Sequence, residues 1–458
     1  MKTGVTSTKH LASMSFRIDP SLHLSEGLKV REELSKSPYG LLTINDVSEK
    51  VFLGNIFSRV FVKDKEHGKT YLAASDTVLA NIETGRYLSN TQANNLKHLW
   101  LKKDWILVTC SGTLGNVTYT NSNFEDKIAT HDLIRIVPND NNILKGVVYA
   151  FLAGKYGYYQ ITQSQFGGVV KHTNDKDVGK IAIPHFPNEF QSMVDELINE
   201  SAHLREEATK LLNEAKDIIS TWINSKFEKH FFQTSSVSFK AIYSSLQHRL
   251  DPPALMNDGV KTMKRVTSKL DNTTIGRING KVYRPGIFKR NYVSDGIPYI
   301  KGSEIFLTNP FRRCDHLSRT RTPFIDEMAM KEGQILITCA GSVGDIKLIT
   351  KEYEDKQSIG SQDIIRLESN DDLYTKEYLF VYLQQPFVYD YIQSMKYGAV
   401  IERIEPFHVE SIPVVKPTKE LSDEITKIIR NYMDCTYRAF NAEEQAISMV
   451  EQEIEKWN

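Results

Sequence analysis

The chain has 458 residues, of which 40% are hydrophobic, and its 57 basic residues balance 57 acidic ones to a net charge of zero. This length allows two ordinary hydrophobic cores, and the neutral charge excludes a global attraction to polyanions, so a nucleic-acid surface would need locally segregated charge. No apolar run predicts a membrane span or a signal peptide, and four cysteines exclude a disulfide framework, so we expect a cytoplasmic protein.

The first predicted domain covers residues 1–186 and consists mainly of short strands. Apolar runs bounded by Gly, Asn and Asp predict these strands. The runs are VFLGNIFSRVFV, WILVTCSGTLGNVTYT, HDLIRIV and KIAIPHFP. In the second run, two strand-like segments flank Ser111–Gly115, where glycine permits a tight turn. A phosphate-binding loop is the alternative for this Gly-x-x-Gly, but it requires a helix after the turn, and a strand follows.

Residues 187–233 are predicted to form a long helix. From Phe190 onward, apolar residues recur in alternating steps of four and three, interrupted at Ser201. This period is typical of a coiled-coil seam, and a helix of about 40 residues is roughly 60 Å long. The seam residues expected to pair with a partner helix are Val194, Leu197, Leu204, Leu211, Ile218 and Trp222.

Residues 234–416 are predicted to form a second β-rich domain, because they repeat the first. Ile106–Gly115 (ILVTCSGTLG) returns 229 residues later (335 − 106) as Ile335–Gly344 (ILITCAGSVG). Cys110 and Cys339 lie within these repeated strands and are expected to be buried free thiols. Five further pairs follow the same order, with offsets of 229 to 232: Arg17–Pro20 with Arg249–Pro252, Phe124–Lys127 with Tyr353–Lys356, Asp132–Arg135 with Asp363–Arg366, Phe166–Val170 with Tyr397–Ile401, and Ile183–Pro184 with Ile412–Pro413. A repeat of this length indicates a duplicated domain with its connector, and it is too long for a solenoid.

Residues 417–458 are predicted to form a second long helix with the same seam. Its expected pairing residues are Leu421, Ile425, Ile428, Tyr432, Ala439, Ala442 and Met449. The alanines suit close approach to the bulky side chains of the first seam, so we expect the two helices to pair as an antiparallel coiled coil. The alternative is that each helix covers only its own domain. The expected fold class is therefore α+β, with two β-rich domains in tandem, each followed by a long helix.

The order of domain, long helix, domain and long helix resembles the specificity (S) subunit of type I restriction-modification systems. ILVTCSGTLGNV and ILITCAGSVGDI look like the strand-turn-strand signature of that family, and HDLIRI and QDIIRL look like the strand that follows. Tyr292–Glu304 looks like its opening segment, whereas the first copy, Thr70–Asp76, lacks the Gly-Ile-Pro step. KIAIPHFP and SIPVVKP look like the proline-marked exits into the helices.

The resemblance implies a division of labour. Each domain is a target-recognition domain that reads one half of a split double-stranded DNA target, and the helical pair fixes the gap between the halves. The helices also dock DNA methyltransferase subunits, expected to be two, and a restriction-translocase subunit can join them. S-adenosylmethionine, and ATP with Mg²⁺ for restriction, are expected on those partners and not on this chain. A membrane plays no part.

Catalytic motifs are incomplete in the sequence, so we expect a chain that is not an enzyme. Asp251–Pro253 is close to an amino-methyltransferase motif, but Ala254 replaces the aromatic residue that would stack a flipped base. Asp345-Ile-Lys347 has one carboxylate and no evident second, which does not make a nuclease metal site. No histidine or cysteine spacing predicts zinc, and no Walker motif occurs.

Local clusters of basic residues supply the candidate DNA contacts, because arginine binds phosphates and reads guanine. Three surfaces are expected: a loop of the first domain, the loops near residues 283–321, and the glycine turns before Lys171 and Arg403. Arg59 aligns with Arg290 at an offset of 231. The candidate residues are Arg59, Lys63, Lys65, Lys69, Lys171, His172, Arg284, Lys289, Arg290, Lys301, Arg312, Arg313, Arg319, Arg321 and Arg403.

Two other functions fit the same pattern. A two-headed coiled-coil adaptor for proteins would need no basic loops, and a dimer of single-recognition subunits would need no duplication. Within the duplication, the copies agree at Thr109 and Thr338 and at Arg135 and Arg366, and they diverge between 63–101 and 298–332. A shared framework with different loops predicts two heads that read different sequences.

Overall fold

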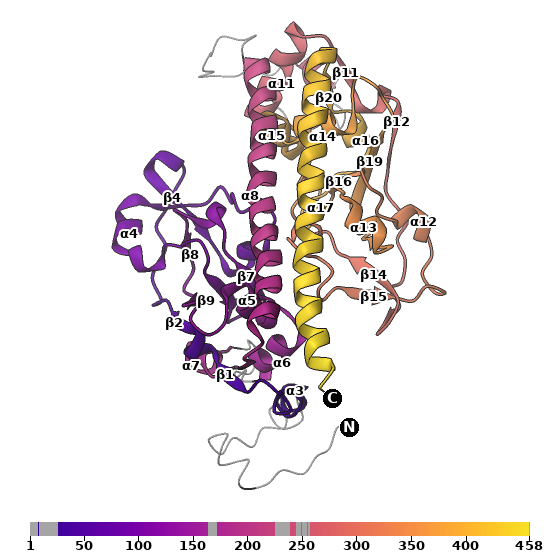
Figure 1. Cartoon of the computed structure of the whole chain (residues 1–458). Coiled ribbons are helices and arrows are strands. Elements are labelled where there is room, and N and C mark those ends of the chain that lie inside the picture. The colour runs from indigo at the N-terminus through magenta and orange to yellow at the C-terminus, as the bar shows by residue number, and fades with distance from the viewer. Residues whose placement is uncertain are drawn as a thin grey trace. The chain divides into compact units, whose positions relative to one another are not determined.

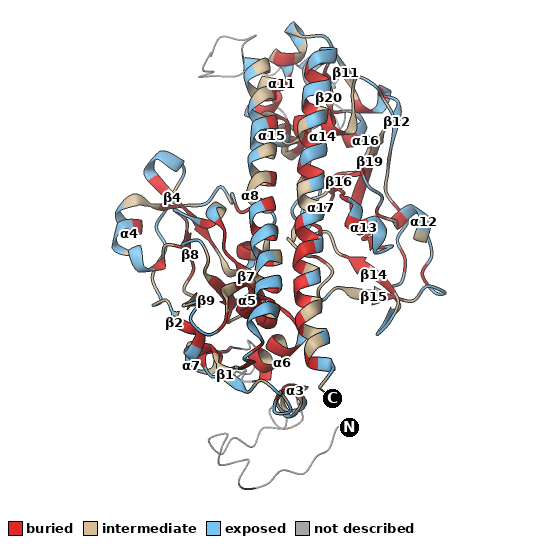
Figure 2. Cartoon of the chain, viewed as in Figure 1, coloured by how far each residue is buried: buried red, intermediate tan, exposed pale blue. Residues whose placement is uncertain are grey.

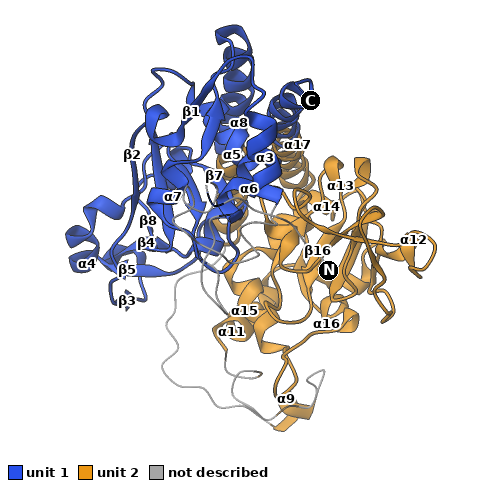
Figure 3. Ribbon diagram, turned by 90° about the horizontal axis from the view of Figure 1, so that it is seen from below, with its two compact units in different colours: residues 1–206, 438–458 blue, residues 207–437 orange. Residues whose placement is uncertain are grey.

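A computed structural model of the chain describes residues 26–163, 172–224, 239–243 and 257–457, together with positions 8, 249 and 254. The sequence motifs at residues 17–20, 166–170 and 251–253, and the candidate Lys171, lie outside the described residues. The chain divides into two compact units, residues 1–206 with 438–458 and residues 207–437 (Figure 3). Each unit therefore combines one β-rich domain with one half of each long helix.

Unit 1 contains three small sheets with helices packed around them (Figure 1). A four-stranded sheet has the order β2-β9-β6-β7, a second has the order β3-β5-β4-β8, and β1 pairs with β10. All strand pairs are antiparallel except β4 with β8. The strands are β1 Leu41–Thr43, β2 Ser48–Leu53, β3 Phe61–Val62, β4 Gly68–Leu72, β5 Tyr87–Ser89, β6 Ile106–Thr109, β7 Val117–Tyr119, β8 Ile128–Ala129, β9 Leu133–Pro138 and β10 Ala182–Pro184. The helices are α3 Glu26–Leu34, α4 Asn90–Asn95, α5 Lys145–Ala153, α6 Lys155–Gln163, α7 Asp175–Gly179 and the first half of α8 Asn188–Asn224.

Unit 2 repeats this topology strand for strand. Its sheets have the orders β12-β19-β16-β17, β13-β15-β14-β18 and β11-β20, and β14 with β18 is again the parallel pair. The strands are β11 Asn272–Thr274, β12 Gly280–Tyr283, β13 Tyr292–Val293, β14 Ile297–Ile300, β15 Asp315–Leu317, β16 Ile335–Thr338, β17 Ile346–Leu348, β18 Ile359–Gly360, β19 Ile364–Ser369 and β20 Pro413–Val415. The helices are α9 Phe239–Tyr243, α11 Asp258–Lys269, α12 Ile325–Met328, α13 Lys351–Asp355, α14 Lys376–Leu383, α15 Pro386–Ser394, α16 Pro406–Glu410 and α17 Lys419–Glu455, whose last half belongs to unit 1.

The α+β fold and the internal duplication are thus confirmed. The repeated motif forms the predicted strand-turn-strand, with β6 antiparallel to β7 and β16 antiparallel to β17. Cys110 and Cys339 are buried free thiols, and each follows its strand directly. The structure also resolves the unmatched opening segment, because β4 occupies the place of β14 and Tyr71 that of Tyr299.

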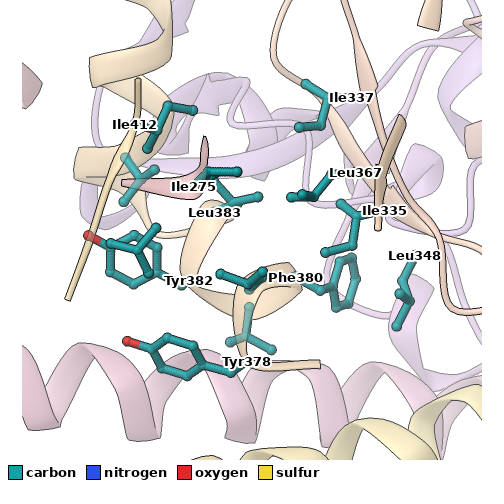
Figure 4. Packing of buried hydrophobic residues seen from close by; sticks show 14 of the residues in the cluster. Ile275, Ile335, Ile337, Leu348, Leu367, Tyr378, Phe380, Tyr382, Leu383 and Ile412 are labelled. Atoms are coloured by element: carbon teal, nitrogen blue, oxygen red, sulfur yellow. The ribbon is translucent and has the colours of Figure 1, made fainter. Parts of the chain in front are cut away.

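The helices that fill the sheet faces were not predicted from the sequence. In unit 2, Tyr378, Phe380 and Leu383 of α14 pack against strand residues that include Ile335 and Leu367 (Figure 4). Residues 377–383 of α14 and 146–153 of α5 are all buried. A helix that is buried on every side has no polar face, so its sequence lacks the amphipathic period that identifies a helix.

In unit 1 the first half of α8 packs on the last half of α17, which makes the pair antiparallel. Buried Val194 and Ile198 of α8 share one core with Val450 and Ile454 of α17. Ser201, which interrupts the apolar seam, is 1% exposed, and its hydroxyl donates to the carbonyl oxygen of Ala439 at 2.7 Å. A small polar residue at this point allows the two helix backbones to approach closely.

Charged side chains also link the two helices of unit 1. Arg205 pairs with the buried carboxylate of Glu443 at 2.5 Å, and the hydroxyl of Tyr149 on α5 donates to the same carboxylate. Glu200 pairs with Arg438 at 3.1 Å. Desolvation offsets much of the Coulomb attraction of this buried pair, so its net contribution to stability is small.

In unit 2 the remaining halves of the helices pack in the same antiparallel sense. Ala215 and Ile219 of α8 lie in one core with Ile425 and Ile429 of α17. The buried residues follow the length of each helix as a stripe (Figure 2). The stripe is wider than a coiled-coil seam, because each helix also covers the sheets and helices of its unit.

The predicted pairing residues lie on this stripe with unequal burial. The buried ones are Val194, Leu204, Leu421, Ile425, Tyr432, Ala439 and Ala442. The half-buried ones, packed at the margins of the cores, are Leu197, Leu211, Ile218, Trp222, Ile428 and Met449. The neighbouring positions Ile198, Ile219, Ile223, Ile447 and Val450 are buried instead.

Enlarging the small residues between the helices tests the antiparallel pairing. Ala439 and Ala446 are 1% and 0% exposed, so Ala439→Leu or Ala446→Leu should overpack the contact and lower the free energy of unfolding by about 1–3 kcal/mol. Urea denaturation followed by circular dichroism measures this. Gln445→Leu, at an exposed position of the same helix, is the matched control and should have little effect. Equal unfolding midpoints for all three variants would contradict the pairing.

Candidate nucleic-acid interface

One arginine occupies the same position in both units and is held there by aromatic side chains. Arg59 Nε donates to the Tyr71 hydroxyl at 2.6 Å, and its guanidinium lies 5.6 Å from the centre of the Tyr71 ring and 6.0 Å from that of Phe57. A guanidinium over an aromatic face is attracted by the ring quadrupole. The Arg59 side chain is therefore fixed although its residue is exposed.

Arg290 reproduces this arrangement in unit 2. Its Nε donates to the Tyr299 hydroxyl at 2.8 Å, and the guanidinium lies 5.8 Å from the Tyr299 ring centre and 6.0 Å from that of Phe288. The hydrogen bond to Tyr299 is the main cause that raises the pKa of Arg290. Two copies that differ in most surface residues thus keep one cation in one geometry.

In each unit, the loop after β8 or β18 contacts the arginine, which is Arg59 in unit 1 and Arg290 in unit 2. In unit 1 a second guanidinium nitrogen of Arg59 donates to the Thr130 hydroxyl at 3.3 Å, and that hydroxyl donates to Asp132 at 3.2 Å. In unit 2 the guanidinium of Arg290 lies 4.0 Å from a carboxylate oxygen of Asp363. The position of Arg59 or Arg290 therefore depends on the shape of this loop.

A buried arginine fixes the same loop in unit 1. Arg135 on β9 is 0% exposed and donates to the carbonyl oxygens of Leu133, Ala129 and Thr130 at 2.9, 3.0 and 3.1 Å. Burial lowers the pKa of Arg135 to about 10, so the group stays charged at neutral pH. In the described part of the chain no carboxylate forms an ion pair with it, and the loop carbonyls carry the solvation of the charge.

Arg366 plays the equivalent part in unit 2. It is 0% exposed and donates to the carbonyl oxygens of Ile364, Gly360 and Met328 at 2.9, 3.0 and 3.2 Å. Its pKa is likewise lowered to about 10 by burial. The Ser361 carbonyl oxygen of the loop also accepts from Arg366 at 3.4 Å, so a different loop shape would leave this cation with fewer acceptors, which is costly in a buried site. The arginine and the loop therefore determine each other's conformation.

The repeated glycine turn lies beside that loop. Gly112 and Gly341 have φ of +69° and +76°, a region that glycine adopts without strain. A Cβ at either position would meet no atom within 4 Å, so the tip of each turn faces open space. The amide of Cys110 donates to the Asp132 carbonyl oxygen, and that of Cys339 to Asp363, both at 3.3 Å. Turn, loop and fixed arginine thus share one edge of each unit.

The last candidate surface joins this edge as well. His172 forms an isolated β-bridge with Ser111, and Arg403 forms one with Ala340. Arg403 also closes a hairpin with Tyr397, whose exposed tip includes Val400. The fixed arginine, the glycine turn and this segment therefore form what we call the loop edge of each unit.

The candidate DNA-contacting residues near the loop edge differ in how far their side chains are exposed and in whether another residue neutralises their charge. Lys289 is exposed, whereas His172 and Arg403 are half-buried. Arg284 is neutralised by Glu405 at 3.0 Å and lies 3.9 Å from the sulfur of Cys339, so it supports the edge from within the protein.

The remaining candidates lie on neighbouring loops. Lys301 forms ion pairs with Asp315 at 2.7 Å and Glu304 at 3.3 Å, and hydrogen bonding to Asp315 raises its pKa. Exposed Arg319 and Arg321 follow β15, and the side chain of Asn291 donates to the Arg321 carbonyl oxygen at 3.3 Å, next to Arg290. The other positions are Arg312 and Arg313 in the loop between β14 and β15, exposed Lys63 and Lys65 in the loop between β3 and β4, and half-buried Lys69, whose ammonium lies 5.1 Å from the Trp100 ring centre.

Sequence reasoning missed the aromatic and loop partners of the fixed arginines. Tyr71 and Tyr299 are 228 residues apart (299 − 71), whereas the arginines are 231 apart (290 − 59). Because the two offsets differ by three residues, comparing the copies at one constant offset does not show that Tyr71 and Tyr299 are equivalent. The sequence showed that Arg135 and Arg366 are repeated, but it did not show that both side chains are buried.

The described residues give no sign of a metal centre or a membrane span. Among them, no group of three or more His, Cys, Asp or Glu side chains is placed to bind a metal ion. Within the same part of the chain, every helix is too short or too polar to cross a bilayer.

The domain that carries the loop edge in unit 2 is similar to a known protein family. The family described as type I restriction modification DNA specificity domain matches residues 274–448. That segment is similar to a type I DNA specificity domain. The match runs from β11 into α17, and the first copy has the same strand order and the same paired arginines. The second copy is therefore similar to a DNA specificity domain, and the first copy repeats its framework.

Solved structures of S subunits give distant matches. The S subunit of a type I restriction-modification system from M. genitalium is 14% identical, with 92% of this chain and 96% of that chain covered and a TM-score of 0.36. The HsdS subunit from Thermoanaerobacter tengcongensis is 12% identical, with 91% and 96% covered and a TM-score of 0.28. No curated protein in the comparison matches the chain.

Replacing a buried arginine by lysine tests the loop constraint. Arg366→Lys keeps the charge, but it replaces two donor nitrogens, Nη1 and Nη2, by one, so the carbonyl oxygens that they reach separately cannot all be satisfied. The variant should lose about 2–4 kcal/mol of unfolding free energy, measured by urea denaturation. Arg277→Lys, at an exposed position in the same unit, is the control and should change stability little. If Arg366→Lys proves as stable as this control, the carbonyl cage does not fix the loop.

Proposed function

We propose that the chain reads a split and asymmetric DNA target, with one half recognised by each unit. The loop edge, present in both units with a fixed arginine, is the observation that carries this proposal. A cation held in one geometry suits a contact that every target offers, and the phosphate backbone is such a contact. The two fixed arginines then position each unit on DNA without reading its sequence.

The loops that differ between the copies supply the specificity. Residues 63–101 of unit 1 contain the exposed Lys63 and Lys65 and helix α4, whereas residues 298–332 of unit 2 contain Arg312, Arg313, Arg319 and Arg321 and helix α12. Base edges in the major groove are read by side chains, and arginine pairs in bidentate fashion with guanine. Different side chains on a shared framework therefore support two unlike half-sites.

The proposed partners are the other subunits of a restriction-modification complex. The resemblance supports two methyltransferase subunits docked on the long helices, with a restriction-translocase subunit joining them. S-adenosylmethionine would bind to the methyltransferase subunits, and ATP and Mg²⁺ would serve restriction on the translocase. The non-DNA adaptor is not favoured, since unit 2 is similar to a DNA specificity domain.

The asymmetry can be tested by mapping methylated bases in cells that express the complete system. The expected motif has two unlike half-sites separated by a fixed gap of any sequence. Arg319→Gln should change only the half read by unit 2, because a base contact is worth about 1–3 kcal/mol of discrimination. Arg290→Gln is the matched control, and it should lower the methylation level without changing the motif. A palindromic or continuous motif would contradict the proposal.

The absence of catalysis in the isolated chain is a separate prediction. The purified chain, supplied with S-adenosylmethionine, ATP and Mg²⁺, should neither methylate nor cut DNA. The reason is that Ala254 stands where a methyltransferase needs an aromatic residue to stack the target base. Incorporation of labelled methyl groups measures the reaction, and the complete complex serves as the positive control. Methyl transfer above background by the chain alone would overturn this prediction.

A further inference from the structure

Both units expose an isoleucine at the same position of the loop edge. Ile56 is 84% exposed and Ile287 is 81% exposed, and they are 231 residues apart (287 − 56). This offset equals that of the fixed arginines Arg59 and Arg290, which follow three residues later in each copy. The exposed isoleucine and the fixed arginine therefore belong to one repeated element.

Folding does not explain this isoleucine. A side chain that is more than four-fifths exposed contributes almost no burial, and a single exposed apolar residue is ordinary at a protein surface. Within this element the anchoring phenylalanine and arginine are also kept, whereas two exposed positions have changed, since Asn55 corresponds to Gly286 and Ser58 to Lys289. Retention of a highly exposed apolar residue at the same position in two diverged copies indicates a contact in the assembled complex.

The anchoring of the element keeps each isoleucine presented to solvent. Phe57 and Phe288, the next residues, turn inward and pack in small cores, and Phe288 is 9% exposed. The arginine beyond is fixed by its tyrosine. Both anchors follow the isoleucine within three residues, so they restrict the backbone that carries it and reduce the conformational entropy lost when a partner binds.

The charge around the element indicates which partner it fits. Arg59 in unit 1 and Lys289 with Arg290 in unit 2 are cations within three residues of the exposed isoleucine. Protein interfaces exclude charge from the centre of an apolar contact, whereas DNA offers phosphates beside apolar deoxyribose and groove walls. An apolar tip beside a fixed cation therefore matches duplex DNA.

We propose that Ile56 and Ile287 are paired, sequence-tolerant apolar contacts to DNA, each lying against deoxyribose and the groove wall while the neighbouring arginine contacts phosphate. The proposal rests on the DNA-reading function of both units. It assigns the element a positioning role common to both half-sites, because the same side chain serves two heads whose reading loops differ. The contact carries no charge, and this property makes it separable from the arginine contact by experiment.

Salt dependence separates the two contacts. The complex of this chain with its methyltransferase subunits is titrated into a fluorescent duplex of mixed sequence between about 50 and 200 mM salt, and binding is followed by anisotropy. Ile56→Ala and Ile287→Ala should each weaken binding by about tenfold, with the slope of log Kd against log salt unchanged. Arg59→Gln and Arg290→Gln should weaken binding and reduce that slope by about one unit.

Controls distinguish the possible failures. Leu41→Ala, at a β1 residue that is 42% exposed, removes a comparable aliphatic side chain and should leave binding unchanged. If the isoleucine variants bind DNA like Leu41→Ala, or if they instead lose methyltransferase during purification, the proposal is wrong and the second result identifies a protein partner. Failure of the unaltered complex to bind any duplex would overturn the proposed function itself.

Discussion

A charged guanidinium can be buried only where fixed acceptors surround it, and this requirement shapes one edge of each unit. Arg135 and Arg366 are fully buried and are solvated by backbone carbonyl oxygens of the adjacent loop and of the strand ends that bound it. The loop cannot relax away from this geometry without leaving a cation unsolvated, at a cost of several kcal/mol. Its carboxylate and hydroxyl side chains are thereby placed where they support the exposed Arg59 and the half-buried Arg290. A buried charge thus positions an exposed one.

The duplication shows which parts of the unit this constraint protects. Strand order, the parallel pair β4–β8 or β14–β18, and the glycine turn are the same in both copies. The segments outside the constraint have diverged, and the basic loop of residues 311–321 has no close counterpart in unit 1. Loops that are not needed to solvate the buried cation are free to change their side chains, which is what a reading surface requires.

The framework could be predicted from the sequence because its strands, turns and long helices follow from local residue patterns. Short apolar runs around Gly112 and Gly341 identify a strand-turn-strand, and the period of four and three identifies α8 and α17. Prediction from the sequence failed for helices α5 and α14, which are buried on all sides and lack an amphipathic period. At the loop edge it identified Arg59 and Arg290 as candidates but not Tyr71 and Tyr299, because contacts between strands depend on register and not on sequence spacing.

The antiparallel helix pair was predicted from its period, but which residues lie deepest was not. Ser201 was read as an interruption, yet it is buried and bonds to the backbone of Ala439. A seam that faces both a partner helix and a domain becomes wider than the two positions per heptad of a free coiled coil. This explains why Ile198 and Ile219 are buried while Leu197 and Ile218 lie at the margin.

A fixed arginine also has a thermodynamic consequence for how such a subunit can change its target. Ordering a free arginine on binding costs up to about 2 kcal/mol of side-chain entropy, and in Arg59 and Arg290 the tyrosine and the aromatic faces already bear most of this cost in the folded protein. In the proposed function, contacts of this kind give each unit an affinity that is independent of base sequence. Substitutions in the diverged loops then alter discrimination without removing the contacts that hold the DNA. A recognition domain built in this way can be duplicated, and each copy can acquire a different half-site while both remain bound.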